Sequence, residues 1–304
     1  MMRIVSLVPH ATELLFALGL AEDVVGVTHE CDYPAAAQTR RQLTRDVLGP
    51  GLGSAEIDAA VRERTLNGDS IYELDRPALE ELEPDLIVTQ ALCSVCAVSY
   101  EDVAELAGEL PSRPRVISLD PKTLEETLAD VRTLAQATGC TERGVELVRE
   151  TATRIERVKL AVGGLSRPRV AALEWLDPVF VAGHWTPQLI QLAGGVDPLG
   201  PAAEPSRTVT WEAVAAAEPQ IVVVMPCGYD AARAHREALA NASELAALGA
   251  ERVVAVNASA YFSRPGPRLI DGLELLAQIL HPERFQADVP ADDLQAVELH
   301  ATRR

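Results

Sequence analysis

The amino-acid sequence predicts an α/β protein with two lobes, each with a mainly parallel sheet flanked by helices, joined by a single long helix. Short apolar runs alternate with helix-like segments in both halves of the chain, which is typical of parallel βαβ units. One pattern also occurs twice. LEELEPDLIVTQALC at 79–93 and VAAAEPQIVVVMPC at 214–227 each combine a short helix ending in Glu-Pro, an apolar strand and a cysteine. The repeat indicates two lobes of related architecture.

The N-terminal lobe is expected to span residues 3–121. Its first strand is RIVSLV at 3–8, followed by the helical pattern TELLFALGL, and VVGVT at 24–28 is the next strand. A glycine-rich stretch then leads to a helix at 55–66, and RPRVISLD at 113–120 supplies a further strand. Strands of this apolar kind favour a parallel sheet covered by helices on both faces.

A helical linker is expected at 122–165, and its second part, 141–162, has charged residues on one face and apolar residues on the other. A helix of ~22 residues spans roughly 33 Å, which is long enough to bridge two lobes. The C-terminal lobe, 166–285, begins the strand–helix pattern again with RPRVAALEW, and an acidic tail follows at 286–304.

Composition excludes several classes of protein. The chain has 304 residues, 48% of them hydrophobic and 24% charged, as in ordinary soluble globular proteins. A formal net charge of −18 argues against nucleic-acid binding, which normally uses a basic face. No apolar run reaches the ~18 residues of a membrane-spanning helix, so we expect no membrane span. The sequence also contains neither of the G-x-S-x-G and H-E-x-x-H motifs that would indicate a hydrolase.

The apolar N-terminus could be taken for a secretion signal. In MMRIVSLVPHATELLFALGL, however, the apolar run is interrupted by Pro9, His10, Thr12 and Glu13. We therefore interpret this segment as the first strand and helix of the fold and predict a cytoplasmic protein. Five cysteines, an odd number, argue against a disulfide framework.

The two halves correspond beyond the repeated cysteine. His10-Ala-Thr12 in the first half parallels His184-Trp-Thr186 in the second. In each case a histidine stands at the expected turn from strand to helix, and a threonine follows that could cap the helix. Exposed amides at helix starts attract anions, so both histidines are candidates to contact a ligand.

Cysteines follow several of the expected strands. Cys93 and Cys227 come after the two matching strands, whose carboxyl ends are where ligands bind in open α/β sheets. This placement predicts a ligand cleft between the lobes. Cys96 completes a C-x-x-C spacing, which suits Zn²⁺ or an iron–sulfur cluster. The candidate metal ligands are Cys31, Cys93, Cys96 and Cys227, with His29 or His184. Thiols that pack as small hydrophobic groups and redox-active thiols are the alternatives.

Two segments resemble one known family. Residues 3–34 contain a strand, Ser-x-x-Pro, Thr-Glu and an apolar helix ending in glycine, and YFSRPGPRLIDGLELLAQILHP at 261–282 fits the same family. They resemble the class III, long-helix substrate-binding proteins of ABC transporters, and the nearest group is the cobalamin-binding members. The resemblance covers about 3–285. It implies a rigid linking helix, a small-molecule ligand in the cleft, modest opening and closing, an ABC permease as a possible partner, and no catalytic activity.

A large planar ligand such as a corrinoid would contact aromatic side chains near strand ends. The guanidinium groups of Arg207 and Arg264 suit a carboxylate or a phosphate. The candidate ligand contacts are His10, Tyr33, Trp175, His184, Trp185, Arg207, Tyr229, Tyr261, Phe262 and Arg264. Packing between the lobes is the alternative for the aromatic residues, and salt bridges to the chain's own carboxylates are the alternative for the arginines.

Three functional hypotheses follow. The first is a protein that binds cobalamin or another corrinoid, or a related metallated ligand. The second is a cytoplasmic metalloprotein with a cysteine-held Zn²⁺ or iron–sulfur site. The third is an enzyme that modifies a corrinoid or a small molecule, with a thiol as nucleophile or ligand.

Overall fold

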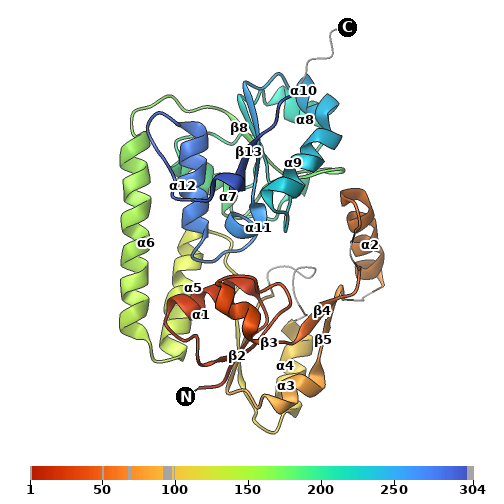
Figure 1. Ribbon diagram of the computed structural model, residues 1–304, viewed down its shortest axis with the longest axis vertical. Coiled ribbons are helices and arrows are strands. Elements are labelled where there is room, and N and C mark those ends of the chain that lie inside the picture. The colour runs from red at the N-terminus through yellow and green to blue at the C-terminus, as the bar shows by residue number, and fades with distance from the viewer. Residues whose placement is uncertain (1, 50, 68–69, 92–97, 99, 300–304) are drawn as a thin grey trace. The chain divides into compact units, whose positions relative to one another are not determined.

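The computed structural model describes residues 2–49, 51–67, 70–91, 98 and 100–299. The chain divides into two compact units. The N-terminal unit contains residues 1–121 and 125–149, and the C-terminal unit contains residues 122–124 and 150–304. Each unit has its own sheet with helices on both faces (Figure 1).

The sheet of the N-terminal unit has five strands in the order β3-β2-β1-β6-β7, and neighbouring strands are parallel. Its strands are β1 (Ile4–Ser6), β2 (Val24–Val27), β3 (Arg41–Gln42), β6 (Leu86–Thr89) and β7 (Arg115–Ser118). Alternate residues of β1 and β6 belong to two different clusters, with Ile4 and Val88 in one and Val5 and Ile87 in the other. Both faces of the sheet are therefore buried.

Helices cover the two faces of this sheet. Helix α1 (Pro9–Ala17) and helix α5 (Leu124–Ala137) pack on one face, since Leu14 and Leu134 join the cluster that contains Ile4. Helices α3 (Arg76–Glu81) and α4 (Tyr100–Glu109) pack on the other. A short antiparallel pair, β4 (Thr44–Asp46) and β5 (Tyr72–Leu74), is joined through helix α2 (Ser54–Leu66).

A single helix, α6 (Thr141–Val162), extends over 22 residues, as the sequence predicts. Its second half is bound to helix α12 (Leu269–Leu280) within the C-terminal unit. Arg154 donates to both Asp271 (2.5 Å) and Glu274 (2.8 Å), and Arg157 donates to Glu274 (2.6 Å). Glu274 is only 2% exposed. Such a buried, multiply bonded carboxylate fixes the position of that half of α6 on α12.

The sheet of the C-terminal unit has six strands in the order β10-β9-β8-β11-β12-β13. They are β8 (Val170–Leu176), β9 (Val179–Val181), β10 (Arg207–Thr208), β11 (Ile221–Val224), β12 (Arg252–Val256) and β13 (Leu294–Ala296). The central strands β8, β11 and β12 are parallel. The outer strands β9, β10 and β13 join in antiparallel fashion. The predicted α/β architecture is confirmed, but this sheet is mixed because β8 returns directly as β9.

Helices cover both faces of this sheet as well (Figure 1). Helix α7 (Thr186–Leu192) packs against α12. Residues of α8 (Trp211–Ala216), α9 (Ala231–Ala240) and α10 (Ala242–Ala247) share a core cluster with alternate residues of the strands. The four-residue helix α11 (Ala258–Tyr261) follows β12. Residues beyond 285 are not merely peripheral, since they supply β13 and a buried Val297.

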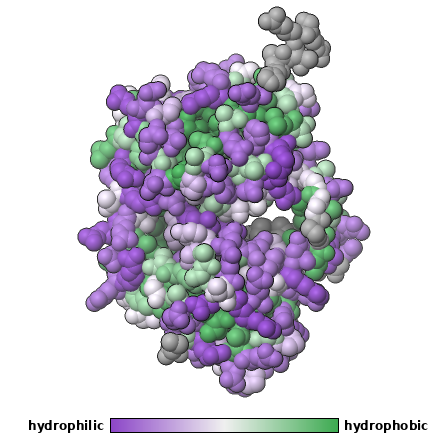
Figure 2. All heavy atoms as spheres, in the orientation of Figure 1, coloured by the Kyte–Doolittle hydropathy of each residue, from purple (hydrophilic) through white to green (hydrophobic). Residues whose placement is uncertain are grey.

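Hydrophilic side chains cover much of the face shown in Figure 2, and hydrophobic ones are scattered among them. Within the described residues, no helix combines the length and the apolar character that crossing a membrane requires.

Candidate ligand site

The carboxyl ends of the three parallel strands of the C-terminal sheet gather several of the predicted site residues. Trp175 lies near the end of β8, Cys227 and Tyr229 follow β11, and α11 with Phe262 follows β12. Parallel strands end at one edge of a sheet, and ligands of open α/β sheets bind at that edge. We call this set of residues the C-terminal edge.

Hydrogen bonds connect the segments of the C-terminal edge. The backbone amide of Cys227 donates to the carbonyl of Glu174 (3.3 Å), which joins β8 to the segment after β11. The amide of Ser259 donates to the carbonyl of Tyr229 (3.0 Å), and the amide of Gly228 donates to the hydroxyl of Ser263 (3.1 Å). These bonds hold the segments that follow β11 and β12 in one arrangement.

Three side chains pack together on this edge. The rings of Trp175 and Tyr229 are 5.4 Å apart, and the guanidinium carbon of Arg233 on α9 lies 3.7 Å from the centre of the Tyr229 ring. Tyr229 is 3% exposed, whereas Trp175 is partly exposed. Trp175 is therefore a partly exposed aromatic ring that is held against Tyr229 and the core of the C-terminal unit. An aromatic ring of this kind is suited to contact a flat ligand.

Three other predicted aromatic contacts are buried. Trp185, Tyr261 and Phe262 are 6%, 5% and 2% exposed. The indole nitrogen of Trp185 donates to the carbonyl of Phe262 (2.9 Å), and the hydroxyl of Tyr261 donates to Asp293 (2.6 Å). Their rings therefore pack within the C-terminal unit and support the edge. Any contact that they make with a ligand stays a prediction.

The carboxyl group of Glu174 lies next to Trp175 in the chain. Glu174 is the extra residue of a β-bulge, because Leu173 pairs with Val181 and Trp175 pairs with Phe180. Bulges redirect side chains and are frequent beside functional sites. Burial raises the pKa of Glu174 to about 7, and a hydrogen bond from Ser206 partly opposes this rise. The carboxyl group is therefore divided between its two protonation states near neutral pH.

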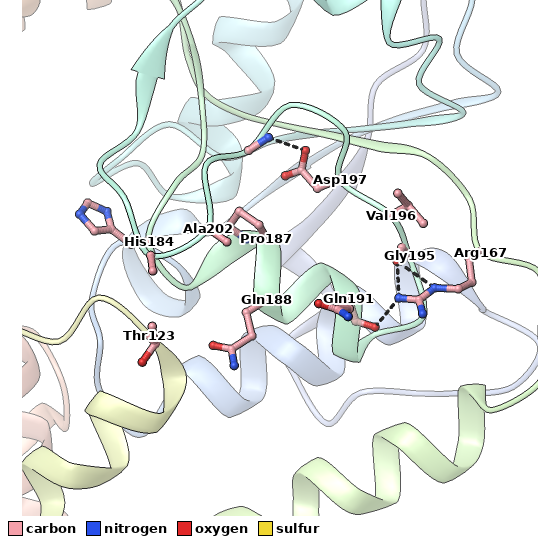
Figure 3. Close-up of a pocket in the computed structure, with 12 residues that line it drawn as sticks. Thr123, Arg167, His184, Pro187, Gln188, Gln191, Gly195, Val196, Asp197 and Ala202 are labelled. Atoms are coloured by element: carbon pink, nitrogen blue, oxygen red, sulfur yellow. Dashed lines mark hydrogen bonds between the residues drawn. The ribbon is translucent and has the colours of Figure 1, made fainter.

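His184 lines a pocket of about 620 Å³ within the C-terminal unit (Figure 3). Its backbone has φ of +49°, and its ring stacks on Trp185 with 5.4 Å between centroids. Burial, and secondarily the positive charge of Lys122, lower the pKa of His184. This shift favours the neutral imidazole, which can accept a hydrogen bond or ligate a metal.

The rest of the pocket combines polar and apolar groups. Arg167 donates to the carbonyls of Gln191 (3.0 Å) and Gly195 (2.8 Å), and the side-chain oxygen of Gln188 accepts from the amide of Leu124 (3.0 Å). Figure 3 shows His184 and Thr123 toward one end and Arg167 and Val196 toward the other. The lining residues are Thr123, Arg167, His184, Pro187, Gln188, Gln191, Gly195, Val196, Asp197, Gly200, Ala202 and Ala203. Such a lining suits amide and hydroxyl groups of a ligand.

The corresponding edge of the N-terminal sheet is built from small polar groups. The hydroxyl of Thr12 donates to Ser6 (2.8 Å), and the sulfur of Cys31 lies 3.1 Å from the Thr12 hydroxyl and 3.3 Å from the Thr28 hydroxyl. Cys31 is 2% exposed and joins the hydrophobic core. His10 is likewise buried, in the first turn of α1. The structure thus places Cys31 in a packing role.

The remaining predicted residues are dispersed. The ring nitrogen Nδ1 of His29 is 2.7 Å from the hydroxyl of Thr44, and Tyr33 is 48% exposed. Arg207 is exposed on β10, where it donates to the carbonyl of Leu199 (3.2 Å). Arg264 is partly buried in the turn before α12.

The predicted metal site receives no support. Cys93 and Cys96 lie outside the described residues, and Cys227 is exposed while Cys31 is buried. Across the described ranges, no group of three or more histidine, cysteine, aspartate or glutamate side chains is arranged to hold a metal ion. The Zn²⁺ and iron–sulfur hypotheses therefore have no structural basis in this part of the chain.

Sequence reasoning missed two parts of the edge. Arg233 stands four residues after Tyr229, a spacing that brings side chains together on a helical turn. That spacing could have identified the pair. Asp293, which accepts the hydrogen bond from Tyr261, lies far along the chain in a tail of low hydrophobicity. No local signal in the sequence connects it to the edge.

Two α/β units, a long helix and a supported aromatic edge define a binding protein of the two-lobed type. The chain belongs to the family of periplasmic binding proteins, whose model matches residues 4–258. This family consists of substrate-binding proteins of ABC transporters and not of enzymes, so the hypothesis of a corrinoid-modifying enzyme is not supported.

Relatives and solved structures agree with this assignment. The chain is 25% identical to a vitamin B12-binding protein of Vibrio cholerae serotype O1 over 287 residues, 91% of this chain and 88% of the relative. It is 23% identical to an ABC transporter substrate-binding lipoprotein of Bacillus subtilis, over 93% of this chain and 81% of the relative.

A periplasmic heme-binding protein from Pseudomonas aeruginosa has the same fold, with a TM-score of 0.72, 20% identity and coverage of 98% of both chains. The periplasmic vitamin B12-binding protein of Vibrio cholerae gives a TM-score of 0.65 at 22% identity, over 93% of this chain and 98% of that one. At these identities the two structures establish the fold.

The predicted cytoplasmic location is wrong. The matching family is one of periplasmic binding proteins, and the relatives include a lipoprotein. The N-terminal residues do form β1 and α1 as predicted, but forming a strand and a helix says nothing about the compartment. The error lay in drawing a location from the apolar pattern of this segment.

Proposed function

We propose that the chain binds a corrinoid of the cobalamin type and delivers it to an ABC permease. The observation that carries the proposal is the alignment with vitamin B12-binding proteins over 91% of the chain. The supported ring of Trp175 at the C-terminal edge is consistent with a flat, partly apolar ligand.

The residues of the C-terminal edge would have different roles in binding. Trp175 would lie against the macrocycle, while Tyr229 and Arg233 hold the indole in place. An aromatic contact of this kind is worth about 0.5–1.5 kcal/mol beyond the apolar area that it buries. The neutral imidazole of His184 could approach the metal of the ligand or accept a hydrogen bond from an amide. Arg264 and Arg207 remain candidates for a phosphate or carboxylate.

Two sequence-based contacts belong to the N-terminal unit. Tyr33 is exposed there, whereas His10 is buried and would contact a ligand only through a rearrangement of α1. Both stay predictions. Of the two, Tyr33 is the better target for mutation, because replacing an exposed ring perturbs folding least.

Haem is the second candidate ligand. The neutral imidazole of His184 suits iron as well as cobalt, and a supported indole suits either macrocycle. The two ligands differ at their rims, because haem carries carboxylates and a corrinoid carries amides. The amide side chains of Gln188 and Gln191, which line the same pocket as His184, favour a ligand rich in amides.

A spectroscopic titration separates these possibilities. Purified protein is titrated with cyanocobalamin and, in parallel, with haemin, and binding is followed in the visible spectrum and by calorimetry. A saturable cobalamin signal with weaker haemin binding is expected. Saturable binding of haemin alone would reassign the ligand, and no saturable binding of either compound would contradict the proposal.

A further inference from the structure

The last part of the chain follows the outer edge of the C-terminal sheet. Strand β13 is antiparallel to β12, with Leu294 opposite Val256, Gln295 opposite Ala255 and Ala296 opposite Val254. Because the strands are antiparallel, β13 begins where β12 ends. The 3-10 turn before it, Ala291–Asp293, therefore lies at the carboxyl end of β12. This turn comes after residue 258, where the match to the family model ends.

Asp293 accepts three hydrogen bonds from helix α11 and its cap residue. Its carboxylate accepts from the side-chain nitrogen of Asn257 (2.8 Å) and from the hydroxyl of Tyr261 (2.6 Å). Its carbonyl accepts from the amide of Asn257 (3.0 Å). Hydrogen bonds to a carboxylate are shorter and roughly twice as strong as bonds between neutral groups.

These bonds hold helix α11 at both ends. Asn257 caps the helix, since its side-chain oxygen accepts from the amide of Ala260 (3.0 Å). The carboxylate of Asp293 accepts from the nitrogen of the same Asn257 side chain and so fixes the orientation of its amide group. Tyr261 is the last residue of α11 and is 5% exposed. Burial and the hydrogen bond to Asp293 both raise the pKa of Tyr261, which keeps its hydroxyl protonated as a donor.

Helix α11 in turn holds the C-terminal edge together. Ser259 donates to the carbonyl of Tyr229, the ring that supports Trp175. The carbonyl of Phe262, directly after α11, accepts from the indole of Trp185. A displacement of α11 would therefore move the supports of both tryptophans.

We propose that Asp293 is a positioning residue for ligand binding, which fixes α11 and through it the aromatic residues of the C-terminal edge. The proposal rests on the proposed function, since the edge is taken to be the corrinoid contact. Asp293 is not proposed to touch the ligand. Its effect passes through Asn257 and Tyr261.

The test uses matched variants of the full chain. Asp293→Ala removes both side-chain hydrogen bonds, Asp293→Asn keeps one carbonyl acceptor, and Tyr261→Phe removes one donor while keeping the ring. Asp292→Asn is the control, because Asp292 is an exposed neighbour with the same charge on the same turn. Circular dichroism and melting temperature establish that each variant is folded.

Cyanocobalamin affinity is measured first. We expect Asp293→Ala to weaken binding by about tenfold, the loss of roughly one well-formed hydrogen bond to a charged group. Asp293→Asn should lose less, and Asp292→Asn should bind as the wild type does. Combining Asp293→Ala with Tyr261→Phe should weaken binding less than the product of the two separate effects, because the two residues share a bond. Wild-type affinity in a folded Asp293→Ala protein would overturn the proposal.

A ligand-independent measurement separates this proposal from the proposed function. In the background Trp175→Phe/Trp211→Phe, Trp185 is the one remaining tryptophan of the chain's three, and its fluorescence reports its surroundings. We expect Asp293→Ala to shift this emission and Asp292→Asn to leave it unchanged. If the wild type binds neither cobalamin nor haemin, the proposed function fails, and the emission shift alone decides whether Asp293 positions the edge. An unshifted emission then overturns the positioning role.

Discussion

The two sheets end in chemically different edges. At the N-terminal edge, Cys31 lies in a buried network of hydroxyl groups with Thr12 and Thr28. At the C-terminal edge, Cys227 is exposed and follows the same strand, β11, as Tyr229, whose ring packs with Trp175. A cysteine thus follows a strand in both units, but Cys31 packs in the core whereas Cys227 lies at the surface. Burial, and not the residue type, decides which role a strand-end thiol takes.

Thiol reactivity is expected to give the largest contrast between the edges. A buried thiol reacts far more slowly than an exposed one, so a thiol reagent should modify Cys227 at least ~100-fold faster than Cys31. Comparing native wild type with Cys227→Ser isolates the exposed thiol, because the rapid phase should lose one equivalent. Cys31→Ala should leave the rapid phase unchanged. A rapid phase that Cys227→Ser does not reduce would contradict the contrast.

The buried carboxyl of Glu174 should make the C-terminal edge sensitive to pH. Its pKa rises from 4.5 to about 7 on folding. Because folding raises this pKa, the contribution of Glu174 to the free energy of unfolding is complete below its pKa in the unfolded state. It is lost as pH rises through its pKa in the folded state. The shift corresponds to a loss on the order of 3 kcal/mol between about pH 5 and pH 8.

Glu174→Gln provides the measurement, because glutamine resembles the protonated carboxyl group in shape and charge. The free energy of unfolding of the variant relative to wild type should increase from pH 5 to pH 8. The pKa of Asp130 is also raised to about 7, by burial and by Asp120 and Glu126. Asp130 is present in both proteins, so its effect on stability cancels when the variant is compared with the wild type. A pH-independent difference would show that Glu174 titrates normally.

The hydroxyl network at the N-terminal edge should contribute to stability. Thr12→Val keeps the shape of the side chain but removes the hydrogen bond to Ser6 and the contact with Cys31. The expected loss is about 1–2 kcal/mol in the free energy of unfolding, measured by chemical denaturation. Thr12→Ser, which retains the hydroxyl, should recover most of it. Equal stability of Thr12→Val and wild type would show that the network is dispensable.

Much of the fold could be predicted from the sequence, because apolar strands, Glu-Pro boundaries and a long amphipathic helix are local signals. A strand at the position of β9 follows from the apolar residues after Asp177-Pro178, but its antiparallel return beside β8 was not predicted, because alternating strands and helices favour parallel pairing. Strand β13 has only three residues, too few for a local pattern, and pairing with β12 makes it a strand. Such strands depend on tertiary contacts and not on local propensity.

The candidate site was predictable only in part. Trp175 and Tyr229 were expected at strand ends because the carboxyl ends of parallel strands follow directly from the strand positions. Whether a ring faces solvent or the core depends on neighbours that are distant in the chain. Tyr261 is an example, since its partner Asp293 is 32 residues away. The sequence placed these residues near the edge but could not assign their exposure.

Calorimetric titration of cyanocobalamin into wild type and into Trp175→Ala tests the central claim most directly. We expect saturable binding by the wild type and a loss of about 2 kcal/mol, roughly 30-fold in affinity, in the variant, as for an aromatic residue at the centre of a binding site. Trp175→Phe should retain most of the affinity. Equal binding by wild type and a folded Trp175→Ala protein would contradict the assignment of the C-terminal edge as the ligand contact.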